Sequence, residues 1–312
     1  MSVLRCRPIF LLATLLVIPI CYAWGQHSDV PNPESVLVLV YASEKPSIDA
    51  GQLRTYQKAA NFGDTAAQLK LGIAFALPSS NMRDDDQAFR WFQRAASEES
   101  PDGMNNLGVF YIEGRGVSRD PSAGFRWLRR AADHKLAPAE LNVGFAYWNG
   151  WGTTSDRAEA VRWFRRAAQG GFAPAQFAYA FSCDTGNGIA HDNFESAKWY
   201  AKAAKQGHAA AMNNLAVQYE EGRGVQRSPA RARELYQASV RGGYTPAAAN
   251  LSRLLLSGQV GRVDVAELCS WIMVAKRVNS ATEDMFQRQC GSLNQSTLAQ
   301  VQQRANGILP GP

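Results

Sequence analysis

Tryptophan returns along this chain at a strict interval of 36 residues. The series consists of Trp91, Trp127, Trp163, Trp199 and Trp271, with Leu235 at the one place that lacks tryptophan. A repeat of roughly 20 to 50 residues is typical of stacked supersecondary units, each of which buries its apolar face only against a neighbour. Such an array presents an extended surface to partners, so the period favours binding over catalysis.

Each unit is expected to begin with an amphipathic helix, which we name helix A. An apolar pair, or a close variant of it, lies 20 residues before each place in the series: Leu71-Gly72, Leu107-Gly108, Val143-Gly144, Tyr179-Ala180, Leu215-Ala216 and Leu251-Ser252. Four positions after the first member come Phe75, Tyr111, Tyr147, Cys183, Tyr219 and Leu255. Residues at this spacing share one face of a helix.

A glycine turn separates helix A from a second helix, helix B. Four turns read Gly-x-Gly, at Gly114 and Gly116, Gly150 and Gly152, Gly186 and Gly188, and Gly222 and Gly224. Glycine is expected there because it adopts positive φ without penalty. Helix B carries the tryptophan and, in most units, an Ala-Ala pair that lets neighbouring helices approach. Helix B is expected to be capped by Gly171, Gly207 and Gly243 in three units.

The whole unit reads A-x-x-x-L-G-x-x-Y-x-x-G-x-G-V, followed after three to six residues by A-x-x-W-x-x-x-A-A-x-x-G. This pattern resembles the Sel1-like repeat family, the relatives of tetratricopeptide repeats with a 36-residue period. Residues 104–132 fit it closely, and residues 212–239 fit apart from the missing Trp and Ala-Ala. The resemblance spans residues 35–276 and implies an α/α superhelix that scaffolds protein assemblies.

We therefore expect an all-α solenoid of about six helix pairs over residues 66–276. A degenerate cap is expected over residues 24–65, with Leu53, Tyr56, Ala59 and Ala60 in the phase of helix B. Val36 to Tyr41 has strand-like residue types, but its phase favours helix A. Residues 277–312 are expected to form a capping segment and tail, with a helix around Ser296 to Ala305.

Residues 1–23 have the pattern of a secretory signal peptide. Arg5 and Arg7 precede an apolar run from Pro8 to Ile20, and small residues lead to a cleavage site after Ala23. The sequence thus predicts a periplasmic or secreted protein; an uncleaved anchor is the alternative. The bulky Ile20 disfavours lipid attachment at Cys21. No later segment is apolar for long enough to cross a membrane.

Three cysteines follow the signal. Cys183 stands where other units carry tyrosine and is expected to be a buried free thiol. Cys269 and Cys290 could form a disulfide in an oxidising compartment. The sequence does not show whether their Cα atoms come within reach, so a free pair remains the alternative.

Two columns of positive charge share the period. Arg54, Arg90, Arg126, Arg162 and Lys198 form the first column, and Lys58, Arg94, Arg130, Arg166 and Lys202 form the second, four residues further on. Residues four apart share a helix face. Our preferred interpretation is a solvated outer face, since members of the resembled family commonly carry Lys or Arg there. The alternative is a track for an anionic envelope polymer or lipid head groups; an exported protein rarely meets nucleic acid.

Helix A also has positions that line the concave groove in the geometry implied by the resemblance. They are Asn105, Val109, Ile112, Leu141, Phe145, Trp148, Phe177, Phe181, Asp184, Asn213, Val217 and Glu220. Aromatic anchors flanked by Asn and carboxylates suit a peptide or a partner helix. The alternative is that tight packing between repeats buries these rings in the core.

Catalytic patterns are weak. His27, His134, His191 and His208 are scattered over the repeat phases, so no pair is placed to bind a metal. No nucleophile-elbow, zinc-protease or phosphate-loop pattern occurs, and the recurrent Gly-x-Gly sequences are better explained as turns. We expect no enzyme, no cofactor and no metal. The predicted function is an exported adaptor that binds an unidentified protein or peptide, in envelope biogenesis or signalling. The alternatives are a cell-wall hydrolase, like the cysteine-rich secreted relatives described as β-lactamases, and a binder of anionic envelope polymers or lipids.

Overall fold

The computed structural model describes residues 39, 50–77, 82–277 and 283–309, and its regular elements there are all α-helices. Contacts divide the chain into two compact units. In the described part, unit 1 extends to Ser182 and includes Gly186–Ala190. Unit 2 contains Cys183–Thr185 and continues from His191.

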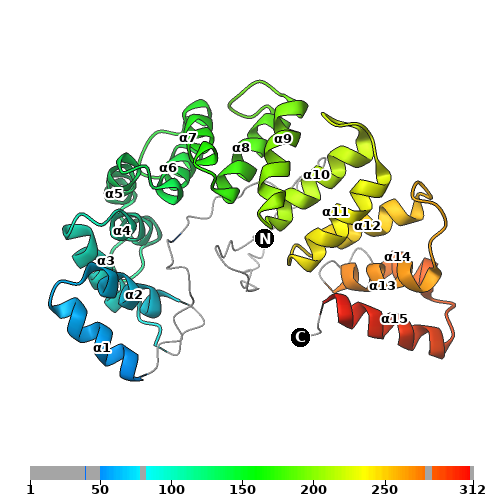
Figure 1. Cartoon of the computed structure of the whole chain (residues 1–312), viewed down its shortest axis with the longest axis horizontal. Helices are drawn as coiled ribbons and strands as arrows, with labels where there is room; N and C mark the ends of the chain where they lie inside the picture. The colour runs from blue at the N-terminus through cyan, green and yellow to red at the C-terminus, as the bar shows by residue number, and fades with distance from the viewer. Residues whose placement is uncertain (1–38, 40–49, 78–81, 278–282, 310–312) are drawn as a thin grey trace, which may run out of the picture. The chain divides into compact units, whose positions relative to one another are not determined.

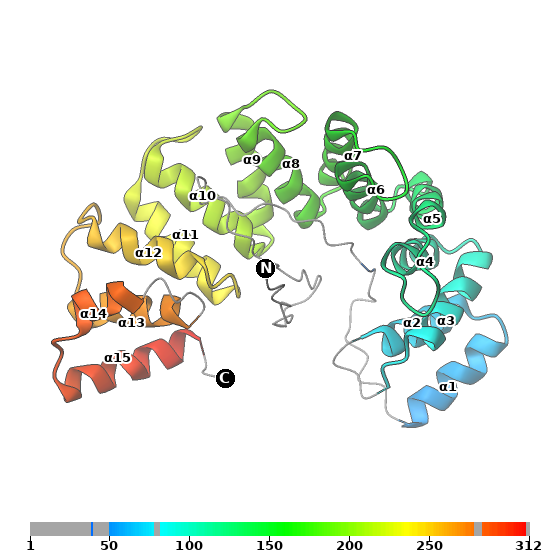
Figure 2. The same cartoon turned by 180° about the vertical axis from the view of Figure 1, so that it is seen from behind.

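Unit 1 is built of paired helices in two layers. In Figures 1 and 2, α2, α4, α6 and α8 form one layer and α1, α3, α5 and α7 the other. The first layer consists of α2 (Thr65–Ala76), α4 (Pro101–Glu113), α6 (Ala137–Asn149) and α8 (Ala173–Thr185), whose last three residues belong to unit 2. The second layer consists of α1 (Ala50–Asn61), α3 (Asp85–Ser97), α5 (Pro121–Asp133) and α7 (Arg157–Gln169).

Unit 2 continues the alternation and ends in a cap. Its repeat helices are α9 (Asn193–Lys205), α10 (Ala209–Glu221), α11 (Pro229–Arg241), α12 (Ala247–Leu256) and α13 (Val265–Lys276). Helix α10 packs against α9 and α11, and α12 packs against α11 and α13. The terminal helices α14 (Glu283–Cys290) and α15 (Gln295–Ile308) both pack on α13 (Figures 1 and 2).

The two predicted helix types have different surroundings. Helix A corresponds to the even-numbered helices α2 to α12 and is buried nearly all round: every residue from Gly103 to Phe110 and from Ala139 to Ala146 is buried. Helix B corresponds to the odd-numbered helices α3 to α13 and is amphipathic. In α5, for example, Leu128 is buried while Arg126 is exposed. The predicted all-α solenoid of helix pairs is confirmed.

Side-chain caps and glycines fix where these helices begin and end. Four helices B begin at an aspartate whose carboxylate accepts a backbone N–H three residues on: Asp84, Asp120, Asp156 and Asp192. The first glycine of each turn is the left-handed C-cap of helix A: Gly114, Gly150, Gly186 and Gly222. The turn prediction is therefore correct.

The second glycine of each turn touches the backbone of the preceding repeat. All four have positive φ, and a Cβ atom there would lie only 2.0 to 2.3 Å from a carbonyl oxygen. These oxygens belong to the first residues of the preceding helix B: Asp85 faces Gly116, Pro121 faces Gly152, Arg157 faces Gly188 and Asn193 faces Gly224. The turn sequence thus sets how closely repeats stack.

The ends of helix B differ slightly from the prediction. Gly171, Gly207 and Gly243 lie one residue past the capping residue, each with positive φ. In two other repeats non-glycine residues take this left-handed conformation, Glu99 at φ 58° and Lys135 at φ 59°.

The terminal segments agree in part with the helices predicted from the sequence. Leu53, Tyr56, Ala59 and Ala60 lie in α1, and the helix expected around Ser296 is α15. Helix α14 was not anticipated. Val36 to Tyr41 lies outside the described residues except for Leu39, which is in no helix.

The three cysteines among the described residues are all buried. Cys269 and Cys290 form a disulfide between α13 and α14, with their Cα atoms 5.9 Å apart. Cys183 forms no disulfide with the other described cysteines.

We predict that alanine at the second turn glycine destabilises the protein more than alanine at an equally left-handed glycine in open space. Gly152→Ala places a methyl group 2.0 Å from the carbonyl oxygen of Pro121. Gly171→Ala, the matched control, meets nothing within 4 Å. Both substitutions cost about 1 to 2 kcal/mol for positive φ, and overpacking adds about 1 to 3 kcal/mol at Gly152. Denaturant unfolding measures the difference; equal losses would contradict an inter-repeat contact.

We predict that His208 makes unit 2 lose stability in acid. Its neutral Nδ1 accepts the N–H of Ala211 as the N-cap of α10, and burial lowers the pKa of His208 to about 4 from 6.5 in the unfolded chain. The contribution is present above pH 6.5 and is lost as the pH falls toward 4. It amounts to roughly 3 kcal/mol.

The non-titrating cap His208→Asn should flatten the decline in stability between pH 7 and 4.5. The exposed His191 supplies the control, since His191→Asn should keep the pH dependence of the unchanged protein. Identical pH profiles for His208→Asn and the unchanged protein would show that capping by neutral imidazole contributes nothing.

Candidate protein-binding surfaces

The twelve predicted groove positions are all buried, none more than 8 % exposed. Burial between the repeats is the alternative that the sequence left open, and the role of these positions in partner binding remains a prediction. They are Asn105, Val109, Ile112, Leu141, Phe145, Trp148, Phe177, Phe181, Asp184, Asn213, Val217 and Glu220. Side chains buried this far offer little area to a partner, and their role in binding has no support from their exposure.

The aromatic positions are covered by neighbouring side chains. Phe145 and Trp148 of α6 pack on Phe164 of α7, with ring centroids 5.2 and 5.8 Å apart. Gly144 makes room for this contact, because a Cβ there would lie 2.5 Å from the Phe164 ring. The guanidinium of Arg157 lies 3.9 Å from the centre of the Trp148 ring. Phe177 and Phe181 lie together on α8, with centroids 6.5 Å apart.

The asparagine positions join one helix A to the next. Asn142 donates its side-chain amide to Asn105 Oδ1 at 2.8 Å in unit 1. Asn250 donates in the same way to Asn213 Oδ1 at 3.0 Å in unit 2. These amides therefore satisfy each other across the repeat boundary, as buried polar groups must.

The two carboxylates have internal partners within unit 2. Asp184 Oδ1 accepts from Arg223 at 2.9 Å and from Gln218 at 3.2 Å. Glu220 accepts from the hydroxyl of Tyr236 at 2.9 Å and from Arg253 at 3.3 Å. Burial, reinforced by Glu220, raises the pKa of Tyr236 far above its usual range, so the phenol stays protonated and donates.

The second basic column is engaged with the tryptophans of helix B. In four successive repeats its cation lies over the ring three residues earlier: Arg94 on Trp91 (4.8 Å), Arg130 on Trp127 (4.6 Å), Arg166 on Trp163 (5.2 Å) and Lys202 on Trp199 (3.7 Å). Two of these cations also bind a carboxylate that lies in helix A or in the segment just before it. Arg130 pairs with Glu99 at 2.8 Å, and Arg166 pairs with the buried Glu140 at 2.6 Å.

The first basic column is exposed throughout. Its members are Arg54, Arg90, Arg126, Arg162 and Lys198. Arg162 and Lys198 pair only with a glutamate three residues earlier on their own helix, at 2.8 and 3.0 Å. Arg90 and Arg126 make no ion pair with any residue that the structure describes.

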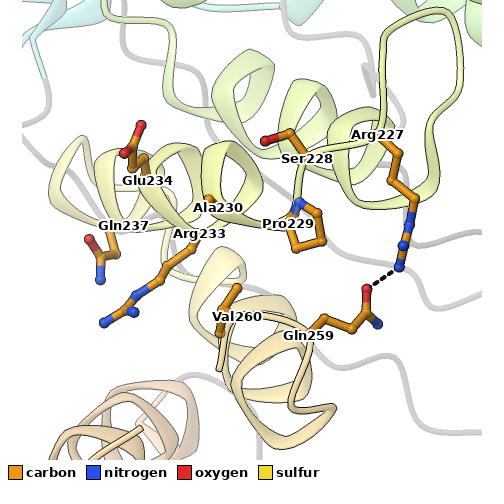
Figure 3. A pocket seen from close by; sticks show the side chains of 9 residues that line it. All are labelled: Arg227, Ser228, Pro229, Ala230, Arg233, Glu234, Gln237, Gln259 and Val260. Carbon is orange, nitrogen blue, oxygen red and sulfur yellow. Dashed lines mark hydrogen bonds between the residues drawn. The ribbon is translucent and has the colours of Figure 1, made fainter. Parts of the chain in front are cut away.

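A recess of about 660 Å³ lies in unit 2 between the start of α11 and the turn after α12 (Figure 3). Its lining consists of Arg227, Ser228, Pro229, Ala230, Arg233, Glu234, Gln237, Gln259 and Val260. Arg227 donates to Gln259 across its mouth, and Arg233 pairs with Glu267 at 2.6 Å. The repeat pattern of the sequence does not by itself indicate this recess.

Within the described ranges, no group of three or more His, Cys, Asp or Glu residues is placed to hold a metal ion. None of the helices there is both long and apolar enough to cross a membrane.

Five consecutive segments of 36 residues match the model of the Sel1 repeat family. They are residues 65–100, 101–136, 137–172, 173–208 and 209–244. These segments cover more than half of the 312 residues, so the chain belongs to the Sel1 repeat family. The predicted sixth pair, α12 and α13, follows the last matched segment.

Solved structures show the same fold. The chain is 28 % identical to a protective antigen present in uropathogenic Escherichia coli strains that displays an SLR fold, with a TM-score of 0.69. That match covers 82 % of this chain but only 56 % of the antigen. A Sel1 repeat protein from Oxalobacter formigenes is 26 % identical, with a TM-score of 0.62 and 82 % and 99 % of the two chains covered. No curated protein matches the chain.

We predict that Trp148→Ala lowers the free energy of unfolding, because Trp148 is part of the core and is not an exposed anchor for a partner. Trp148 is 5 % exposed and packs on Phe164, so its truncation should cost about 3 to 5 kcal/mol. The half-buried Trp127 is the matched control, and Trp127→Ala should cost clearly less. Chemical denaturation of both variants measures this. If Trp148→Ala kept its stability and bound a partner more weakly, the result would support the predicted groove.

Proposed function

We propose that this chain is an exported scaffold that binds another protein. The observation that carries the proposal is the stack of five Sel1 repeats, because proteins of this family generally act as protein–protein interaction scaffolds. Stacked repeats expose a long series of equivalent positions, so a partner can contact several repeats at once.

Export is proposed from the sequence and is supported by one feature of unit 2. The signal-like segment 1–23 lies outside the described residues. The disulfide between Cys269 and Cys290 is of a kind that persists in the periplasm or outside the cell and is rare in the cytosol. We therefore assign the scaffold to the cell envelope or the medium, with a role in envelope biogenesis or signalling.

The partner is expected to contact side chains that the repeats leave exposed. The twelve groove positions are buried, whereas the outer face of helix B and the ends of helix A carry exposed residues such as Ser122 and Asn149. This distribution favours contacts from helix B and the turns over insertion between the helices A.

A second candidate function is binding of an anionic envelope polymer or of lipid head groups. The specific observation in its favour is the first basic column, which is exposed in every repeat where it occurs. Binding of this kind should weaken steeply between low and moderate salt, because exposed charges are screened over about 10 Å at 0.1 M salt. A hydrolytic activity has no comparable observation behind it.

Photocrosslinking in the cells that produce the protein tests the scaffold. A photoreactive residue is placed at Ser122 on α5, at Asn149 at the end of α6, or at Gln303 on α15 as a control beyond the repeats. We expect a specific partner from at least one repeat position, competed by excess unlabelled protein, and none from Gln303. Absence of any competed partner at both repeat positions would contradict the proposed function.

A further inference from the structure

The two basic columns, which look alike in the sequence, are held differently in the structure. Each cation of the second column lies over a tryptophan of its own helix from Trp91 to Trp199, and two of them bind carboxylates as well. A cation stacked on a ring or paired with a carboxylate has part of its binding capacity occupied. The second column therefore contributes to the stability of the repeats and is less available to a ligand than the first.

The first column is left available on unit 1. Arg90, Arg126 and Arg162 lie at equivalent places on α3, α5 and α7, one per repeat. The side chain of Arg162 is 77 % exposed, and its one ion pair is with Glu159 on its own helix. Arg90 and Arg126 are exposed and form no ion pair among the described residues. The three belong to the same compact unit, so their order and spacing are fixed by the stacking of the repeats.

All four members of the first column on unit 1, including Arg54 on α1, are arginines, whereas the column continues as Lys198 on α9. This distinction matters because guanidinium binds a carboxylate with two parallel hydrogen bonds, while an ammonium group acts as a point charge. A discrete row of guanidinium groups is suited to discrete carboxylates.

We propose that Arg90, Arg126 and Arg162 bind an extended acidic segment of a partner protein, which crosses α3, α5 and α7 with one carboxylate on each arginine. The proposal rests on the proposed scaffold function and names its surface and the chemistry of its partner.

The spacing of the column fits such a segment. Helices α3, α5 and α7 pack on the helices A between them, α4 and α6, more than on one another. An extended chain advances about 3.3 Å per residue, so acidic side chains separated by several residues are needed to reach successive arginines. A segment whose acidic residues are adjacent would reach only one arginine at a time.

Carboxylates close to the column disfavour a densely charged polymer. Glu159 lies beside Arg162 on α7. At the start of α3, Asp84 has its pKa lowered mainly by hydrogen bonds from Gln87, with a smaller contribution from Arg90. A polyphosphate with a charge on every unit would be repelled by these groups, whereas a peptide with spaced carboxylates avoids them.

Peptide binding tests the surface directly. The probes are fluorescent peptides with three glutamates separated by two to five residues, of which the tightest binder serves as the spaced peptide, and the comparison peptide has the same composition with the glutamates adjacent. The triple variant Arg90→Gln, Arg126→Gln, Arg162→Gln should bind the spaced peptide about tenfold more weakly at low salt, as the sum of modest exposed ion pairs. The unchanged protein should prefer the spaced peptide.

A matched variant separates the column from net charge. Arg241→Gln, Arg262→Gln, Arg288→Gln removes the same three charges from exposed sites in unit 2. This unit 2 variant should change the Kd for the spaced peptide less than twofold. Equal losses in both triple variants, or equal binding of both peptides, would overturn the proposal in favour of diffuse charge. Tighter binding of inorganic polyphosphate, lost in the column variant, would overturn it in favour of an anionic polymer.

Thermal unfolding of both triple variants should match that of the unchanged protein, because all six arginines are exposed. A crosslinked partner that the column variant still captures would overturn this surface and leave the scaffold function standing. A lack of any captured partner would overturn the scaffold function, while the peptide measurement would still decide the surface.

Discussion

The arrangement of the repeats depends on a backbone contact at the second glycine of each inter-helix turn. At Gly116, Gly152, Gly188 and Gly224 there is no room for a Cβ atom, because a carbonyl of the preceding helix B occupies that space. The same residue must also have positive φ. Two constraints thus coincide at one position, and they hold each turn against the repeat before it. The stacking of helix pairs follows from this contact.

Close stacking explains what became of the polar and aromatic residues of helix A. Once neighbouring helices approach this closely, Asn105 and Asn142 find hydrogen-bonding partners in each other, and Phe145 and Trp148 enclose Phe164. Residues that would anchor a partner in an open groove become part of the interior. The exposed charge then lies on helix B and the turns.

The basic residues of helix B fall into two groups, one that stacks on tryptophan and one that is exposed to solvent. A cation three residues after tryptophan covers the ring and limits its contact with water, while the cation one residue before it points to solvent. This division repeats with the 36-residue period, so the surface charge of unit 1 is as regular as its core. Equivalent charges at regular intervals can align an extended ligand with successive repeats of such a protein.

The sequence by itself determined the helix pairs, the turns, the family and the positions of both basic columns. These features depend on local spacing: apolar residues at i and i+4, glycine at positive φ, and one strict period. Only the tertiary structure decided that the twelve groove positions are buried, that the second basic column is engaged with tryptophan, and that Cys269 meets Cys290. Burial depends on which side chains of neighbouring helices meet across the helix pairs, and the spacing of residues within one segment does not specify those contacts.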